Sequence, residues 1–239
     1  MLAGMSPRAL DRRRFLKATA ASAATAALAA SPASLALGSP AGRRFAWVHL
    51  DGGNDPWNTV VPLEDDEYHR VRGRLAIRAA DALRLDGVGG AVGGAVGLHP
   101  SLGALRRRFD RGEVAIVRGV FGAAARGHLA AADDARTWLD GSRARIERIE
   151  GFDTHARQAP RHADRLALLD ATVAGAAEDL VVVTSEFGRT FAANSFGGTE
   201  HADSSLAFVI GRSVRGGLHG DVKEPRAARI LSDLVRVRA

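Results

Sequence analysis

Four short apolar runs rich in β-branched residues recur along the chain, each bounded by turn residues or an amphipathic stretch. They cover residues 45–50, 114–120, 180–184 and 206–211, and their length and composition predict buried strands. Amphipathic stretches at 101–112 and 156–178 predict helices. Apolar strands that alternate with such helices predict an α/β fold, with a mainly parallel sheet covered by helices on both faces.

The two helices have recognisable ends and faces. Ser101 is expected to cap the first helix, and Gly112 to end it. The apolar faces are expected to contain Leu102, Leu105 and Phe109 in the first helix, and Leu166, Leu169 and Val173 in the second. His99, ahead of the cap, is interpreted as structural, and His162 is expected on the exposed face of the second helix.

The N-terminal segment combines a basic stretch, an alanine-rich apolar run and an exit of small residues. Within it, DRRRFLK (residues 11–17) contains a twin arginine and resembles a Tat-type secretory signal. We therefore expect residues 1–38 to be a signal peptide, delivered by the Tat translocase to the periplasm or medium, and residues 39–239 to form a single α/β domain.

An uncleaved membrane anchor is the alternative, because the apolar run approaches the roughly 20 residues that a span requires. Its apolarity comes mainly from alanine, however, which makes insertion marginal. No stable membrane span is therefore expected after cleavage.

Composition excludes several classes of protein. The chain has 239 residues, 46% of them hydrophobic, which allows one substantial core. Residues 1–38 carry five basic residues and one acidic residue, so they account for most of the formal net charge of +6. A nucleic-acid partner is not expected for the rest. The sequence has no cysteine, no Gly-x-Ser-x-Gly motif and no Gly-Lys-Ser/Thr ending of a P-loop. A thiol nucleophile, the serine nucleophile of that motif and a P-loop phosphate site are therefore not expected.

Carboxylates and imidazoles stand near the ends of predicted strands. Asp51 and Glu186 each follow a predicted strand, and His201 lies in a predicted loop that begins with two glycines. Asp153 and His155 are two residues apart, so an extended backbone directs both side chains to one side. Ligands of open α/β sheets gather beyond the carboxyl ends of the strands. We therefore expect these five residues to hold a divalent metal, Zn, Mn or Ca, in a hydrolytic site.

The same residues also have purely structural interpretations. Asp51 before two glycines could form only a turn, and Glu186 could pair with Arg189 in a buried ion pair. Glu200 is interpreted as a solvated loop residue, because neighbouring residues in an extended chain point apart and His201 is the better ligand.

Several motifs, in this order behind the Tat-like leader, resemble the DUF1501 proteins: HLDGGNDPWNTVVP, GLHPSLGAL, GEVAIVRGV, GFDTHARQ, VVVTSEFGRT and GGTEH. The resemblance covers most of residues 45–221. It implies an exported bacterial protein related to the alkaline phosphatase and sulfatase superfamily, with an alkaline-phosphatase-like core. By the same analogy, the metal ligands are Asp51, Asp153, His155, Glu186 and His201.

This resemblance predicts a metal-dependent hydrolase that acts on a small anionic ester, either a phosphate or a sulfate. His128 and Arg189 are the expected catalytic residues. Arg189 would stabilise the charge that develops on the oxyanion, through a bidentate contact. His128 has a second interpretation, as a residue at a helix N-terminus.

The chain departs from the family pattern at several points. Gly127 precedes His128 where relatives have serine, and glycine has no attacking oxygen. Phe187 takes the place of a second metal ligand. Residues 138–150 replace a longer insert, and the C-terminal part is shorter, so the core is expected to be truncated and to expose sheet faces and edges. An exported binding or assembly protein that keeps the fold, without metal or catalysis, is therefore the alternative function.

Overall fold

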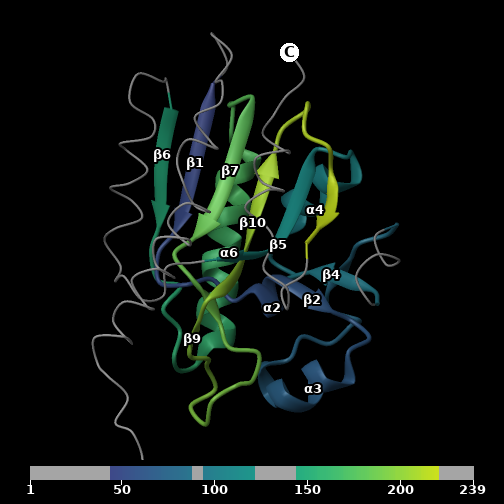
Figure 1. The fold of residues 1–239 in the computed structure, drawn as a ribbon, viewed down its shortest axis with the longest axis vertical. Coiled ribbons are helices and arrows are strands. Elements are labelled where there is room, and N and C mark those ends of the chain that lie inside the picture. The colour runs from purple at the N-terminus through teal and green to yellow at the C-terminus, as the bar shows by residue number, and fades with distance from the viewer. Residues whose placement is uncertain (1–43, 88–93, 122–143, 221–239) are drawn as a thin grey trace, which may run out of the picture.

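The structure is a computed structural model that describes residues 44–87, 94–121 and 144–220 (Figure 1). The expected signal peptide at residues 1–38 and the expected catalytic residue His128 lie outside these ranges. Among the described helices, none has the length and apolar character that crossing a membrane requires.

A six-stranded sheet forms the centre of the molecule, in the order β11-β5-β10-β7-β1-β6. Five of its strands run in the same direction and β10 runs opposite to them, which confirms the expected mainly parallel sheet. The strands are β1 (Phe45–Leu50), β5 (Val114–Phe121), β6 (Ala144–Ile149), β7 (Leu180–Ser185), β10 (Ser204–Ile210) and β11 (Gly217–His219). The four strands expected from the apolar runs are therefore all present.

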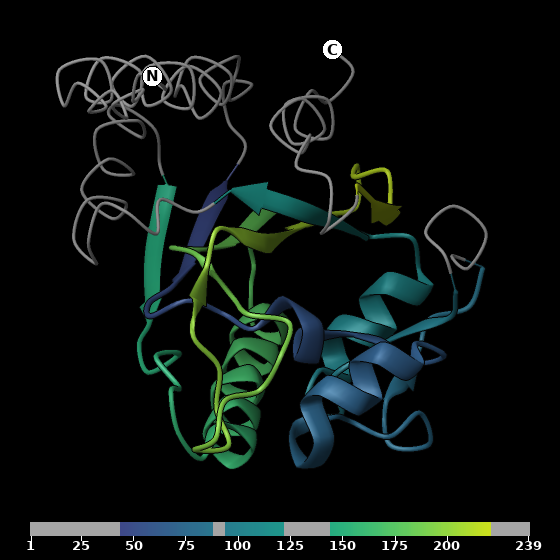
Figure 2. The same cartoon turned by 60° about the horizontal axis from the view of Figure 1, so that its bottom comes forward.

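The main core lies between one face of this sheet and two helices. These helices are α4 (Gly103–Asp110) and α6 (Gln158–Ala174). Alternate strand residues such as Val48 and Val183 point towards them, and the expected apolar faces of both helices are buried in the same cluster. Figure 2 shows both helices on the same side of the sheet. The described helices that pack on this sheet thus form one layer, and the second layer that was expected is not found among them.

Helix α4 begins differently from the expectation. Its N-cap residue is Leu102 rather than Ser101, and the cap makes no side-chain hydrogen bond. Instead, the carboxylate of Asp170 in α6 accepts hydrogen bonds from the backbone N–H groups of Ala104 and Leu105, both at 2.8 Å. A neighbouring helix therefore satisfies the N–H groups that a local cap would otherwise serve.

His162 is another correction, because it is buried in α6 with 1% of its surface exposed. Its Nε2 lies 2.9 Å from Asn54 Oδ1. Burial lowers the pKa of His162 to about 3 and that of His99 to about 4. His99 is buried as well, and its Nδ1 accepts a hydrogen bond from the backbone N–H of Ser101, which agrees with its structural interpretation.

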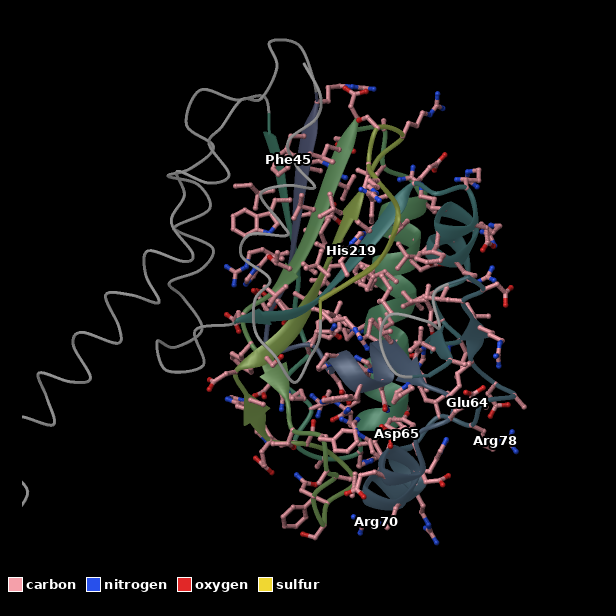
Figure 3. The ribbon with its side chains drawn as sticks, turned by 45° about the vertical axis from the view of Figure 1, so that its right-hand side comes forward. Phe45, Glu64, Asp65, Arg70, Arg78 and His219 are labelled. Carbon is pink, nitrogen blue, oxygen red and sulfur yellow. The ribbon has the colours of Figure 1, made fainter. Side chains whose placement is uncertain are left out.

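A smaller layer lies beside the main sheet. It contains α2 (Pro56–Thr59), α3 (Asp66–Arg72), the 3₁₀ turn η2 (Gly73–Leu75) and a sheet in the order β2-β4-β3. These strands are β2 (Val60–Pro62), β3 (Leu83–Arg84) and β4 (Val96–Leu98). Figure 3 shows Arg70 and Arg78 on this side of the molecule, away from Phe45 at the start of β1. Both arginines pair with nearby carboxylates at the surface, where such pairs contribute little to stability.

A buried polar network joins this smaller layer to the main sheet. Asp55 caps α2 through its bond from the Trp57 N–H and forms a two-point ion pair with Arg72 of α3. It also accepts a hydrogen bond from Gln158 at the start of α6, whose Oε1 accepts one from Thr199. Burial acts to raise the pKa of Asp55, but the ion pair with Arg72 and the other contacts of the carboxylate together lower it. The network fixes the loop after β1 relative to α3 and α6.

Candidate metal centres

The expected ligands lie at the edge where β1, β6 and β7 end. Asp51 directly follows β1, Glu186 directly follows β7, and Asp153 lies in the segment after β6. The backbone N–H of Phe152 donates to the carbonyl of Asp51 at 3.0 Å, so the segments after β1 and β6 stay paired beyond the strands. The parallel register therefore brings these side chains to one edge, as such sheets do for their ligands.

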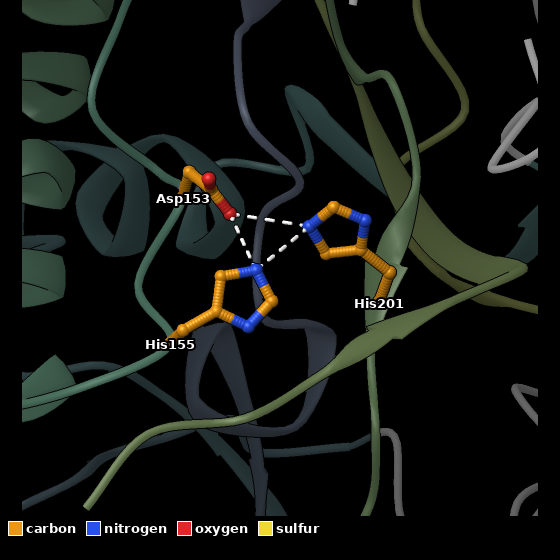
Figure 4. Close-up of side chains that lie close together, drawn as sticks. All are labelled: Asp153, His155 and His201. Carbon is orange, nitrogen blue, oxygen red and sulfur yellow. Dashed lines mark hydrogen bonds and ion pairs between the residues drawn. The ribbon is translucent and has the colours of Figure 1, made fainter. Parts of the chain in front are cut away.

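Three of the expected ligands meet in one group, which we call the outer cluster: Asp153, His155 and His201 (Figure 4). Asp153 Oδ1 lies 3.0 Å from His155 Nε2 and 3.1 Å from His201 Nε2, and these two nitrogens are 3.0 Å apart. His201 begins the short strand β9 (His201–Ala202), which pairs with β8 (Gly188–Arg189). Two segments distant in sequence thus supply one oxygen and two nitrogen atoms to a common point.

Glu200 is exposed in a loop, as the sequence predicts, and it also takes part in this arrangement. Its Oε2 lies 2.8 Å from His155 Nδ1, and its Oε1 accepts a hydrogen bond from Asn194. These interactions with Asn194 and His155 lower the pKa of Glu200. A carboxylate that accepts the Nδ1–H of a histidine leaves the Nε2 lone pair for a metal, an arrangement common around metal-binding histidines. Glu200 therefore orients His155.

Phe187 packs against one residue of the outer cluster. Its ring packs on that of His201 with the ring centroids 4.1 Å apart. The same ring lies against Gly53, where an added Cβ would overlap it and where φ is +80°. Only glycine combines this backbone angle with this close approach. The aromatic residue that replaces a possible ligand thus holds a neighbouring ligand in place.

Arg189 has a structural role, because it connects the loops that form the site. Its side chain is fully buried and donates to the carbonyl oxygens of Gly53, Phe152 and Thr199, and to the carboxylate of Asp153. Burial acts to raise the pKa of Asp153, but the hydrogen bonds from Arg189 and His201 lower it. The expected bidentate contact of Arg189 with a substrate is not supported by this geometry. Arg189 forms its ion pair with Asp153.

Asp51 and Glu186 belong to a separate group, the inner cluster, together with His49 of β1. The five expected ligands therefore do not surround one common point. Gly52 lies between the clusters: its N–H donates to Glu186 Oε2 at 2.9 Å, and an added Cβ would contact the backbone nitrogen of Asp153.

Sequence reasoning missed His49, although a signal was present. His49 and Asp51 are two residues apart at the end of a strand, so both project from the same face of the sheet. A histidine in that position is unusual for a run that otherwise consists of apolar residues.

Residues 135–233 match the family model described as "Protein of unknown function (DUF1501)". The matched segment contains the whole outer cluster and Glu186, whereas His49 and Asp51 precede it. The match supports the family resemblance of the motifs. No curated protein and no solved structure matches the chain significantly.

Proposed function

We propose that this protein is a metal-dependent hydrolase of small phosphate or sulfate esters, with the outer cluster as its metal centre. The observation that carries the proposal is the convergence of Asp153, His155 and His201 at contacts of 3.0–3.1 Å. The DUF1501 match and the relation of the motifs to the alkaline phosphatase and sulfatase superfamily favour the same chemistry.

The donor set fits a divalent ion such as Zn, and Mn or Ca are the other ions to test. Ligand atoms about 2.1 Å from a tetrahedral ion lie about 3.4 Å from one another, so a small outward movement of these side chains would admit one. The side chains of His155, Asp153 and His201 are 42%, 47% and 33% exposed. Three protein ligands with an open side leave room for water or substrate, as in catalytic zinc sites.

A bound ion would polarise the ester and lower the pKa of a water molecule towards about 7, which supplies a nucleophile without a serine. The chain itself contributes the positions of the ligands: Glu200 holds the His155 ring, and Phe187 holds the His201 ring.

Arg161 supplies a positive charge beside the cluster. Its side chain is exposed, and its Nη2 donates to the carbonyl of Asp153 at 3.4 Å. An exposed guanidinium can bind the oxygen atoms of a phosphate or sulfate group in a bidentate manner. Within this proposal Arg161, and not the buried Arg189, attracts the anionic ester.

The proposed place of action is the periplasm or the medium. The twin arginine in DRRRFLK and the alanine-rich run after it are typical of a Tat-type leader. The Tat translocase is the partner that this leader implies.

The test combines metal analysis with turnover of p-nitrophenyl phosphate and p-nitrophenyl sulfate by the purified protein. We expect EDTA to abolish turnover, and one of Zn, Mn or Ca to restore it. His155→Ala should lower turnover at least about 100-fold, and Glu200→Gln should lower it about 10-fold to 100-fold through weaker metal binding. His69→Ala, a histidine substitution on α3, is the matched control and should retain activity.

Turnover that survives EDTA or the His155→Ala substitution would contradict the proposal, since it would come from another site or a contaminant. A protein that neither binds metal nor hydrolyses either ester would favour the exported binding or assembly protein instead.

A further inference from the structure

We infer that a pocket between η2 and α6 binds a small polyhydroxylated molecule that carries an anionic group, such as a sugar acid. None of the residues that line this pocket belongs to the outer or the inner cluster. The inference therefore goes beyond the proposed hydrolase activity and does not rest on it.

The pocket has the size of a small-molecule site. Its volume is about 490 Å³, and sites for small molecules usually have about 300–1,000 Å³. Three segments enclose it, namely η2 with the residues after it, the loop before α4, and the first turns of α6. Leu75, Ile77 and Pro100 give it apolar walls, which suit the C–H groups of a carbon chain or ring.

His162 contributes a hydrogen-bonding atom that no described residue serves. Its Nε2 lies 2.9 Å from Asn54 Oδ1, which can only accept, so Nε2 carries the proton and Nδ1 presents a lone pair. This Nδ1 is buried and makes no hydrogen bond to any residue in the described ranges. Because buried polar atoms are nearly always satisfied, we expect a bound molecule to donate a hydrogen bond to it.

His99 contributes the opposite kind of group. Its Nδ1 accepts a hydrogen bond from the backbone N–H of Ser101 at 3.0 Å, so the proton of a neutral ring lies on Nε2. Within the described part of the chain, no residue accepts a hydrogen bond from this Nε2. The ring therefore offers a hydrogen-bond donor to the pocket that it lines.

A hydroxyl is the group that matches the two rings. Their centroids lie 5.7 Å apart with the planes at 85°, so a small group can contact both. Burial lowers the pKa of His99 to about 4 and that of His162 to about 3, so both rings are neutral at pH 7. A hydroxyl donates one hydrogen bond and accepts another. A carboxylate between the rings would only accept, and would leave the lone pair of His162 unsatisfied.

Positive charge lies among the exposed residues of the pocket. Arg74 and Arg78 both line it, and both are exposed; Figure 3 shows Arg78 at the surface. Arg78 is paired with Asp81 through hydrogen bonds of 2.6 and 2.9 Å, whereas Arg74 forms no ion pair with any described residue. A guanidinium without a partner can bind a carboxylate through two parallel hydrogen bonds. The pocket thus combines a site for hydroxyl groups with a site for an anion.

Isothermal titration calorimetry of the purified protein at pH 7 tests the site with three probes. Gluconate carries hydroxyls and a carboxylate, sorbitol only hydroxyls, and hexanoate only a carboxylate. We expect gluconate to bind at least about 10-fold more tightly than either of the others. Arg74→Met should lower the affinity for gluconate to about that for sorbitol. Arg70→Met, at an exposed arginine of α3 outside the pocket, is the matched control and should leave gluconate binding unchanged.

Two further variants separate this site from the rest of the molecule. His99→Phe should weaken the binding of both gluconate and sorbitol at least about 10-fold. His155→Ala should bind gluconate as the wild type does, since gluconate held by a metal in the outer cluster would be lost in this variant. Arg74 is exposed, so its variant tests the inference even if His99→Phe does not fold.

Four results would each overturn the inference: no binding of gluconate at about 10 mM, equal affinity for gluconate and hexanoate, unchanged affinity in Arg74→Met, or loss of binding in His155→Ala. Absence of ester turnover would bear only on the proposed function.

Discussion

The two buried histidines predict a steep loss of stability in mild acid. Burial lowers the pKa of His162 to about 3 and that of His99 to about 4, whereas each would titrate near 6.5 in the unfolded chain. As the pH falls below 6.5, the unfolded state binds protons that the folded state does not bind. The free energy of unfolding must therefore fall with pH, until the pH reaches the folded-state pKa values.

The magnitude follows from the size of this pH range. Each histidine contributes about 1.4 kcal/mol for every pH unit over which only the unfolded state is protonated. Between pH 6 and pH 5 the two together should lower stability by about 2.4 kcal/mol, before most carboxylates titrate. Over its full range His99 should cost about 3 kcal/mol and His162 about 5 kcal/mol, comparable to the whole stability of a typical domain.

Urea unfolding followed by circular dichroism, at a series of pH values and in EDTA, measures this slope. His162→Gln should reduce the loss between pH 6 and pH 5 to about 1.2 kcal/mol, because one of the two titrating groups is gone. Leu169→Ala is the control, since Leu169 is a buried residue of the same helix and does not titrate. It should lower stability equally at every pH. Equal slopes for wild type and His162→Gln would refute the reasoning.

Three further substitutions should lower the free energy of unfolding, measured by urea titration at pH 7. Gly53→Ala should cost more than about 2 kcal/mol, because its φ of +80° and the adjacent Phe187 ring both oppose a Cβ. Arg72→Met should cost about 3–5 kcal/mol, since it leaves the buried carboxylate of Asp55 without its ion pair. Asp170→Ala should cost about 1 kcal/mol through the loss of the cap of α4, and an unchanged midpoint would contradict this role.

Local pattern was sufficient for four strands of the six-stranded sheet and for the edge at which the ligands lie, whereas β6 and β11 were not predicted. Runs such as residues 180–184 have the composition of a strand whatever surrounds them, and parallel pairing then places Asp51 and Glu186 together. The cap of α4 could not be predicted in this way, because Asp170 lies 66 residues away from the N–H group that it serves. Ser101 satisfies the local rule, but a partner from α6 takes its place.

The division of the site into two clusters also depends on tertiary structure. The ligand types are visible in the sequence, yet the distance between Asp51 and Asp153 depends on how closely the Gly52 backbone approaches the segment after β6. The expectation that His162 lies on the exposed face of α6 is wrong for a related reason. A histidine on a helix usually faces solvent, and only the buried loop containing Asn54 gives it an interior partner.

The buried guanidinium of Arg189 makes one position intolerant of a nominally conservative change. Its planar fork reaches carbonyl oxygens on the segments that follow β1 and β6 and on the segment that leads into β9. A lysine ammonium presents its protons from a single atom and cannot span acceptors spread over that plane. With lysine at this position, the three loops would lose the hydrogen bonds that connect them. Arg189 therefore determines the conformation of this edge of the sheet.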